Sequence, residues 1–210
     1  DAWVNGDLPF SSPEVKRAFQ IMGGIFLNDD YVYGGRDGLL TTNYIDVSAP
    51  MFEEIPGCWL DRDGPYVTTG YPDTAEFGVD YDLFSLPPID EEYGTPYLVA
   101  GNIMAMFNDR PEVRAVIQYL AMGESLKKWI SVGGILSPHK DFNLDWYVNG
   151  VDRKQAEMYQ NTTSVRFDGS DSMPGEVGSG TFWKYSTDYI SGTTDLDTML
   201  KDIDDSWPRE

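Results

Sequence analysis

The chain alternates between stretches with helical spacing of apolar residues and shorter stretches in which apolar residues alternate or run together. The first helical stretch follows Ser11-Ser12-Pro13-Glu14, where serine can cap a helix, proline fits the first turn and the acid complements the helix dipole. Its apolar residues are Val15, Phe19, Met22 and Phe26. This spacing predicts a helix that weakens at Gly23-Gly24 and ends near residues 28–30.

Four more helices are expected downstream. Asp109-Arg110-Pro111-Glu112 opens one of them, and its apolar stripe comprises Val113, Val116, Ile117 and Leu120. Two others are expected at 124–132, before Gly133-Gly134, and at 152–161. The last begins with a capping box formed by Thr194 and Asp197. Its inward residues are Leu196, Met199, Leu200, Ile203 and Trp207, and its water-facing residues are Asp195, Asp202, Asp204 and Asp205.

Three stretches have the patterns of strands. Residues 51–60 mix apolar and polar side chains up to a turn at Cys58-Trp59, and residues 77–83 alternate in the manner of a half-buried strand. Residues 97–107 form a mostly apolar run, interrupted at Gly101-Asn102, with the length of a buried strand. Residues 31–37 are expected to be a loop that turns at Gly34-Gly35. Strands separated by helices indicate an α/β fold.

Composition narrows the choice of function classes. The chain has 210 residues, of which 41% are hydrophobic and 14% aromatic, enough for a packed core. With 35 acidic and 15 basic residues, its formal charge of -20 repels the phosphates of nucleic acids and anionic membrane surfaces. No nucleic-acid partner is therefore expected, and we interpret the excess of acid as a solvated surface rather than as a cation site.

Metal, cofactor and membrane chemistry find little support in the sequence. Cys58 is the only cysteine and His139 the only histidine, which removes internal disulfides and the usual zinc sites. We therefore expect no metal and no cofactor. No run of about 18 apolar residues is present, so no transmembrane span is expected. No signal peptide precedes Asp1, a pattern shared by mature and truncated chains.

The segment 172–184 carries the most distinctive chemistry. Glycines at 175, 178 and 180 allow its backbone to approach another surface, and they lead directly to Phe182 and Trp183. Neighbouring residues in a helix point about 100° apart, so the two rings cannot serve one face. One of them is expected in the interior and the other at a ligand. Flat apolar rings suit the C–H faces of sugars.

A second ring candidate is Trp59, which lies in the turn Gly57-Cys58-Trp59-Leu60-Asp61-Arg62. The side chains of Asp61 and Arg62 can hydrogen-bond sugar hydroxyls beside an indole face. A lone tryptophan at such a turn can equally cap the core. Because Gly101-Asn102 interrupts an apolar run, Asn102 faces either a cleft or its own backbone in a bulge.

Enzyme and nucleotide signals are weak. A glycoside hydrolase would need two carboxylates about 5 to 10 Å apart, and Asp168 and Asp171 are close enough in sequence to be considered. Close acidic pairs are common in a chain with 35 acidic residues, so we interpret both as loop and cap residues. Gly133-Gly134 lacks the flanking residues of a P-loop or a dinucleotide fingerprint, and no nucleotide site is expected.

Several segments resemble, in order along nearly the whole chain, the extracellular solute-binding proteins (family 1) of carbohydrate ABC importers, in particular the alpha-glucoside-binding branch. The glycine-aromatic segment and the last helix carry the resemblance together with segments 9–26, 28–35, 58–60, 86–88, 109–114, 137–140 and 166–171. The resemblance implies a periplasmic-binding-protein-like (type II) fold, with two α/β lobes that close on a sugar. This chain is similar to the C-terminal half of such a protein.

The resemblance also implies a division of the chain between the lobes. Residues 1–96 would belong mainly to the second lobe, residues 97–136 would form a crossing strand and helices of the first lobe, and residues 137–210 would return to the second. Relatives often have His-Arg-Gln after the Cys-Trp-Leu turn, where this chain has Asp61-Arg62-Asp63. The resemblance therefore does not define the polar side chains around the sugar, nor which sugar is bound.

The matching positions make Trp59 and Trp183 stacking residues and Asn102 a polar contact from the crossing strand. The resemblance thereby assigns the indole of Trp183, rather than the ring of Phe182, to the ligand. The full set of expected ligand-binding residues is Trp59, Arg62, Gly101, Asn102, Phe182 and Trp183. No catalytic residue is expected.

The implied function is that of a non-catalytic receptor outside the cytoplasm, in a periplasm or as a lipoprotein at the outer face of the cell membrane. It would deliver an oligosaccharide to the permease subunits of an ABC transporter. Membrane association would come only through the permease or through a lipid anchor that this chain does not contain. Two alternatives are a glycoside hydrolase or other carbohydrate-active enzyme, and a structural fragment without ligand affinity of its own.

Overall fold

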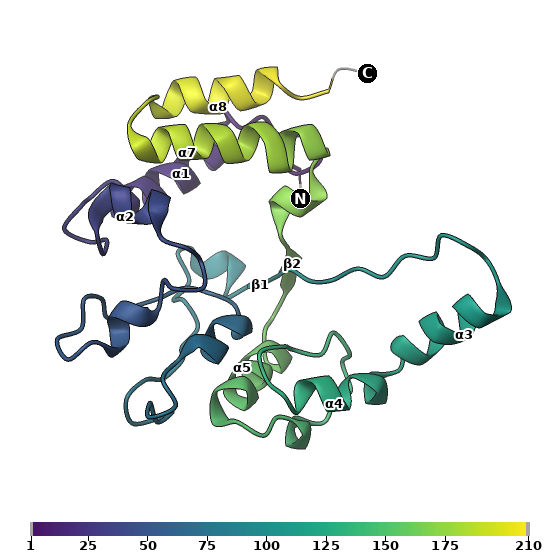
Figure 1. Ribbon diagram of the computed structural model, residues 1–210. Coiled ribbons are helices and arrows are strands. Elements are labelled where there is room, and N and C mark those ends of the chain that lie inside the picture. Colours follow the sequence, from purple (N-terminus) through teal and green to yellow (C-terminus); the bar gives the residue numbers. More distant parts are fainter. Residues whose placement is uncertain (1, 209–210) are drawn as a thin grey trace. The chain divides into compact units, whose positions relative to one another are not determined.

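The computed structural model describes residues 2–208 and has a mixed α/β composition in which helices dominate (Figure 1). Backbone contacts divide the chain into two compact units. Unit 1 comprises the residues up to Pro50, the stretch Leu98–Ala100, and the residues from Arg166 onward. Unit 2 comprises Met51–Tyr97 and Gly101–Val165. The expected assignment of 1–96, 97–136 and 137–210 to two lobes uses other boundaries and stays a prediction.

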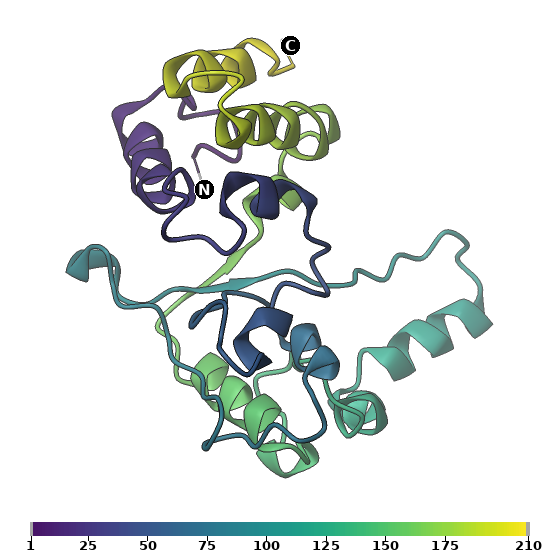
Figure 2. The same ribbon diagram turned by 60° about the vertical axis from the view of Figure 1, so that its left-hand side comes forward.

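Unit 1 is built from helices. They are α1 (Pro13–Phe26), α2 (Gly35–Thr41), α6 (Gly169–Ser172), the π-helix η6 (Glu176–Phe182), α7 (Trp183–Ser191) and α8 (Leu196–Asp205). Both ribbon views show α7 and α8 side by side (Figure 1 and Figure 2). No residue separates η6 from α7, so the π-helix continues directly into the α-helix.

The N-terminal helix is confirmed together with its expected start. The Ser12 hydroxyl accepts a hydrogen bond from the N–H of Val15 (3.4 Å), and Pro13 occupies the first turn. Gly23 serves packing, because a Cβ at this position would lie 3.3 Å from Cζ of Tyr189 and still closer to the Tyr189 hydroxyl. Glycine therefore allows α1 to approach Tyr189 of α7.

The expected loop at 31–37 is wrong in its second half, because α2 begins at Gly35. The expected tight turn is confirmed. Gly34 and Gly35 have φ of 71° and 63°, a left-handed conformation that glycine adopts without steric cost. The turn thus leads straight into a helix instead of a longer loop.

The core of unit 1 joins the first helix of the chain to the last one. Its buried residues are Phe10, Val15, Phe19, Met173, Val177, Tyr189, Met199, Leu200 and Ile203. The inward face expected for the last helix is confirmed, since Met199, Leu200 and Ile203 are buried while Leu196 and Trp207 pack against them.

Two expectations for the last helix are wrong. Asp195, not Thr194, caps α8, because its carboxylate lies just before the first helical residue and accepts from the N–H of Thr198 (2.9 Å). Asp204 does not simply face water. Its carboxylate accepts from the N–H groups of Phe10 (2.6 Å) and Ser11 (3.0 Å), which draws the helix face toward the start of the chain.

Unit 2 has shorter elements. They are the 3₁₀ turns η2 (Pro65–Gly70), η3 (Glu91–Tyr93), η4 (Gly123–Leu126) and η5 (Leu144–Trp146), and the helices α3 (Pro111–Leu120), α4 (Lys127–Ile130) and α5 (Gly150–Gln160). The three helices predicted in this region are confirmed, although the first turn of the predicted 124–132 helix is 3₁₀. A core of Ile130, Phe142, Tyr147 and Ala156 holds α4 and α5 together, whereas α3 buries no residue.

A buried carboxylate fixes the start of α5. Asp152 has no exposed surface, and its Oδ2 accepts from the N–H of Gly134 (2.8 Å) and from the amide of Asn149 (2.9 Å). Asn149 in turn caps α5 by accepting from the N–H of Asp152 (2.7 Å). The Gly133-Gly134 turn is thereby attached to the first turn of α5.

One two-stranded sheet forms among residues 2–208, between β1 (Tyr97–Val99) and β2 (Val165–Phe167). The N–H of Tyr97 donates to the carbonyl of Ser164 (2.9 Å), and the N–H of Asp168 donates to the carbonyl of Val99 (2.8 Å). From the first hydrogen bond to the second, the residue number rises in both strands, so the two strands run parallel.

The three strand predictions are mostly wrong. Residues 51–60 contain no strand, and Ala49–Phe52 form the 3₁₀ turn η1. Residues 77–83 keep only an isolated bridge between Phe77 and Tyr81. Of residues 97–107 only β1 forms, and Ile103 and Phe107 are 81% and 98% exposed. An apolar run needs a partner strand to become a strand, and β2 offers one only to the first three of these residues.

Among the described residues, no helix is both long and apolar enough to cross a membrane.

Candidate functional site

The glycine-aromatic segment of unit 1 folds as η6 followed by α7. In a π-helix residues five apart share a face, whereas in an α-helix they lie about 140° apart. Val177 and Phe182 are five apart; Val177 is buried in the core of unit 1, and the partly buried Phe182 packs against this core. The π-helix therefore allows one helical segment to turn both of these side chains toward the core.

Of the three glycines in this segment, Gly178 makes the close approach that the sequence indicates, and it approaches α6 of the same unit. A Cβ at Gly178 would lie 2.9 Å from the carbonyl carbon of Ser170 and even closer to its oxygen. A Cβ at Gly175 would meet no atom within 4 Å. The close approach thus serves packing within unit 1.

The two adjacent rings lie in different surroundings, as their helical spacing predicts. The ring centroid of Phe182 lies 6.3 Å from that of Trp3, 5.7 Å from that of Phe10 and 6.3 Å from that of Phe19. Trp183 is 72% exposed. The Phe182 ring therefore packs in the core, and Trp183 presents its indole to solvent.

The polar groups beside Trp183 are engaged within α7. Lys184 pairs with Asp188 (2.6 Å) and lies over the Tyr185 ring at 4.2 Å from its centroid. The hydrogen bond from Lys184 to Asp188 raises the pKa of the lysine. The Thr187 hydroxyl donates to the Trp183 carbonyl (2.9 Å). The Trp183 indole is thus a large apolar group that α7 exposes to solvent.

In unit 2, Trp59 lies on an irregular loop and is 79% exposed, so it does not cap a core there. Its neighbour Arg62 is exposed as well. The next turn is held by Asp63, whose Oδ1 accepts from the N–H of Gly64 (2.6 Å) and from the Tyr66 hydroxyl. The loop therefore carries an indole and a guanidinium in solvent above a hydrogen-bonded turn.

Burial, and then neighbouring carboxylates, raise the pKa values of several groups in and beside this loop. Loss of solvation, followed by the nearby Asp63 carboxylate, raises the pKa of Asp61. Burial raises the pKa of Tyr71 to about 12, and the negative charge of Asp61 adds to the effect. Burial also raises the pKa of the Cys58 thiol, with further contributions from Asp61 and Glu53. Tyr71 therefore lies close to the loop and stays protonated at physiological pH.

Gly101 and Asn102 follow the end of β1 and are exposed. A Cβ at Gly101 would meet no atom within 4 Å. These two residues belong to unit 2 with Trp59 and Arg62, whereas Trp183 belongs to unit 1. A joint role of both groups in one ligand site stays a prediction.

Sequence reasoning missed a cluster of four aromatic rings in unit 2. Tyr71 and Phe52 have ring centroids 4.8 Å apart, and Tyr81 packs edge-on against Tyr71 at 5.0 Å and against Phe77 at 5.6 Å. These residues come from segments without a shared period. Only the density of Phe and Tyr between residues 52 and 84 signals the cluster in advance.

The weak enzyme signal has a structural explanation. Asp168 caps the short helix α6, where its carboxylate accepts from the N–H (2.9 Å) and the hydroxyl (2.6 Å) of Ser170. Its interpretation as a cap residue is confirmed. No group of three or more potential metal-binding side chains occurs among residues 2–208.

Each unit also has a shallow hollow. The hollow of unit 1, of about 330 Å³, lies between Phe10, Asp204 and Trp207. That of unit 2, of about 410 Å³, lies between Tyr119, Lys127 and Trp146. None of the predicted ligand-binding residues lines either hollow.

Two curated proteins are similar to this chain. It is 44% identical, over all of its 210 residues, to the osmoprotective compounds-binding protein GgtB of Synechocystis sp., of which it covers 49%. It is 34% identical, over 199 residues or 94% of the chain, to the alpha-glucosides-binding periplasmic protein AglE of Rhizobium meliloti, of which it covers 43%. The resemblance to solute-binding proteins is confirmed.

The chain spans about half the length of these relatives, and the matched part is their C-terminal half. No protein-family model matches the chain, and no solved structure gives a significant match. The names of both relatives describe binding proteins, which accords with the absence of an enzymatic pattern from the sequence.

Proposed function

We propose that this chain is part of the substrate-binding component of an ABC importer for an oligosaccharide with alpha-glucoside character. In this proposal the protein works outside the cytoplasm, catalyses no reaction and hands its ligand to the permease subunits. The proposal is supported by the similarity to an alpha-glucosides-binding periplasmic protein over 94% of the chain. It is equally supported by the chemistry of the exposed rings.

The observation that carries the proposal is the placement of Trp183. Its indole is 72% exposed on a helix whose preceding residue, Phe182, is fixed among core rings. The apolar face of this exposed indole is suited to the C–H face of a pyranose. Because the helix is anchored by its neighbour, the ring can stack on a sugar with little ordering cost.

Unit 2 carries the other side chains of the proposed set. Trp59 offers a second indole, Arg62 a planar set of hydrogen-bond donors, and Asn102 an amide that both donates and accepts. We assign stacking to Trp59 and Trp183, and hydrogen bonds with sugar hydroxyls to Arg62, Asn102 and the backbone at Gly101. In the complete protein the ligand would lie between two lobes, which would close around it.

A second ligand class follows from the other relative. GgtB is named for osmoprotective compounds, and the chain is 44% identical to its matched half. The segment Asp61-Arg62-Asp63 departs from the residues that sugar-binding relatives often have after this turn, so a different hydroxylated solute is the second candidate. An alpha-glucosylated polyol is one such solute, because it combines a pyranose face with free hydroxyls.

The test is a calorimetric titration of the full-length protein with maltose, trehalose, an alpha-glucosylated polyol and glycine betaine. We expect saturable binding of at least one glucoside and a loss of about tenfold or more in affinity for Trp183→Ala and for Trp59→Ala. Trp129→Ala is the matched control, because Trp129 is 52% exposed but has no assigned role. Absence of binding to every glucoside, or unchanged affinity in both variants, would refute the proposal.

A further inference from the structure

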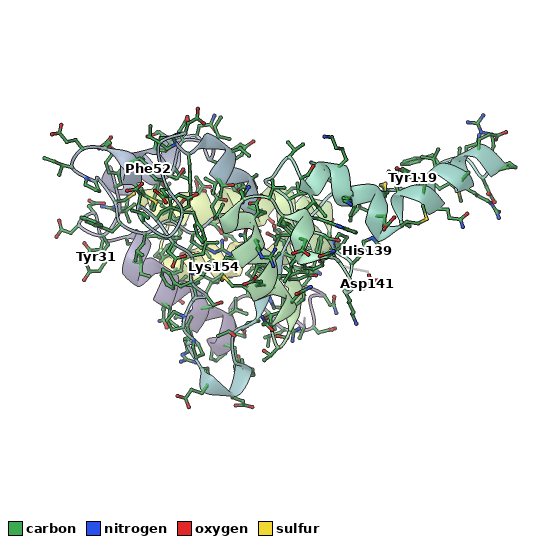
Figure 3. The ribbon with its side chains drawn as sticks, turned by 90° about the horizontal axis from the view of Figure 1, so that it is seen from below. Tyr31, Phe52, Tyr119, His139, Asp141 and Lys154 are labelled. Atoms are coloured by element: carbon green, nitrogen blue, oxygen red, sulfur yellow. The ribbon has the colours of Figure 1, made fainter. Side chains whose placement is uncertain are left out.

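The loop that carries Trp59 is closed at its base by two aromatic rings of unit 2. Phe52 precedes the loop and Tyr71 follows it, and their ring centroids are 4.8 Å apart (Phe52 is labelled in Figure 3). Segment 53–70 of unit 2 therefore begins and ends at one pair of contacting rings. Trp59, Asp61 and Arg62 all lie within this closed segment.

The two halves of the segment are held differently. In the second half, η2 contributes the buried Val67, and a Cβ at Gly134 would touch Thr69 at 3.1 Å, so this half packs on the Gly133-Gly134 turn that follows α4. The first half has no helix or strand after Phe52. Its apolar side chains are largely exposed, at 84% for Ile55 and 79% for Trp59.

The rings continue from the loop base to a helix. Tyr81 packs edge-on against both Phe52 (5.9 Å, 83°) and Tyr71 (5.0 Å, 90°). Phe77 follows at 5.6 Å from Tyr81 and lies against α5, where a Cβ at Gly150 would come within 2.6 Å of its ring.

Lys154 on α5 contacts Phe77, the last of these packed rings. Lys154 lies 5.9 Å from the Phe77 centroid and pairs with Asp82 at 2.5 Å (Lys154 is labelled in Figure 3). The contacts thus run without a gap from α5 through Phe77 and Tyr81 to the base of the loop. Edge-to-face pairs of this kind favour one relative orientation of their rings.

The geometry points to Phe52, Tyr71, Tyr81 and Phe77 as an aromatic clamp that positions Trp59 for its ligand. This inference rests on the proposed function, because it assigns to the clamp the ordering of a loop that binds sugar. An unanchored loop would have to be ordered when the ligand binds, which lowers affinity without any loss of contact. Tyr71 is the central positioning residue, since it closes the loop and contacts Tyr81.

The experiment compares Tyr71→Ala, Tyr71→Leu and Tyr71→Phe in the full-length protein by hydrogen exchange. We expect the amides of residues 64–71, where the N–H groups of Val67 and Tyr71 are hydrogen-bonded, to exchange about tenfold faster in Tyr71→Ala and Tyr71→Leu, because aromatic pairs are lost. Tyr71→Phe keeps the ring and should exchange as the wild type does. Tyr93→Ala, at an exposed ring outside the clamp (68%), is the control.

Sugar affinity provides the second measurement. Tyr71→Ala and Tyr71→Leu should bind the best glucoside about three- to tenfold more weakly, and Tyr71→Phe should restore wild-type affinity. Unchanged exchange at 64–71 in both truncated variants would overturn the clamp, as would an equal acceleration in α5, which would indicate a general loss of structure. If no sugar binds to the wild type, the proposed function fails, while the exchange result still decides the clamp.

Discussion

Replacing Gly23 by alanine should destabilise the protein, whereas the same change at Gly24 should stabilise it. Both glycines lie inside α1, so each replacement gains about 1 kcal/mol of helix propensity. They differ in their surroundings. A Cβ at Gly24 would meet no atom within 4 Å, whereas one at Gly23 would lie closer than 3.0 Å to the Tyr189 hydroxyl and 3.3 Å from its Cζ.

The magnitude follows from this difference. Tyr189 is buried at 9% exposure in the core of unit 1, so its ring has little room to move. Overpacking of this kind costs about 1–3 kcal/mol. Because the gain in propensity is common to both variants, Gly23→Ala should unfold about 1–3 kcal/mol more easily than Gly24→Ala.

The assay is urea unfolding of the full chain, followed by circular dichroism, with Tyr189→Phe as the relieving change. Removing the hydroxyl leaves Cζ as the nearest atom, at a distance that needs a shift of only a few tenths of an ångström. In the Tyr189→Phe background, Gly23→Ala and Gly24→Ala should therefore agree within about 0.5 kcal/mol. The reasoning is wrong if Gly23→Ala stabilises as much as Gly24→Ala, or if Tyr189→Phe brings no relief.

Further predictions concern the close approach of η6, the cap of α8 and the titration of Tyr71. Gly178→Ala should lower stability by about 3 kcal/mol, since its Cβ would overlap the Ser170 carbonyl, while Gly175→Ala should be tolerated; comparable urea midpoints would contradict this. Asp195→Ala should lower the melting temperature more than Thr194→Ala does. Hydrogen bonds from Thr198 lower the pKa of Asp195, so this difference should be present above the usual aspartate pKa and shrink as the pH falls toward 2. Burial raises the pKa of Tyr71 to about 12, so the folded protein holds the phenol proton more tightly than the unfolded chain does. The contribution of protonated Tyr71 to the free energy of unfolding should therefore be complete below pH 10 and lost as the pH rises through 12. Ultraviolet titration should show a tyrosinate signal near pH 12 that is smaller by one tyrosine in Tyr71→Phe.

The sequence predicts helices α1, α3, α5 and α8 well because their signals are local, whereas it does not predict α2, α6 and α7. Ser12 and Pro13 mark the start of α1 with groups that bond within one turn, and the apolar spacing of α8 identifies its buried face. The predicted N-cap of α8, Thr194, lies one residue before the observed N-cap, Asp195. Both residue types can cap a helix, and only the folded backbone decides between them.

Strands and the candidate site were harder to predict because they depend on partners far away in the chain. The apolar run at 97–107 looks like a buried strand, yet only its first three residues find a parallel partner, at β2. The opposite placement of Phe182 and Trp183 follows from helix geometry, so it could be predicted. The contact between Phe52 and Tyr71 could not, because ring packing leaves no period in the sequence.

The contacts of Asp204 with Phe10 and Ser11 have a consequence for the order of folding during synthesis. The core of unit 1 combines Phe10 and Phe19 with Met199 and Ile203, so it cannot close until α8 has left the ribosome. Unit 2 is nearly continuous in sequence, between Met51 and Val165, and has all of its residues much earlier. During translation α1 therefore meets its core partners in α8 only after the middle of the chain has been made.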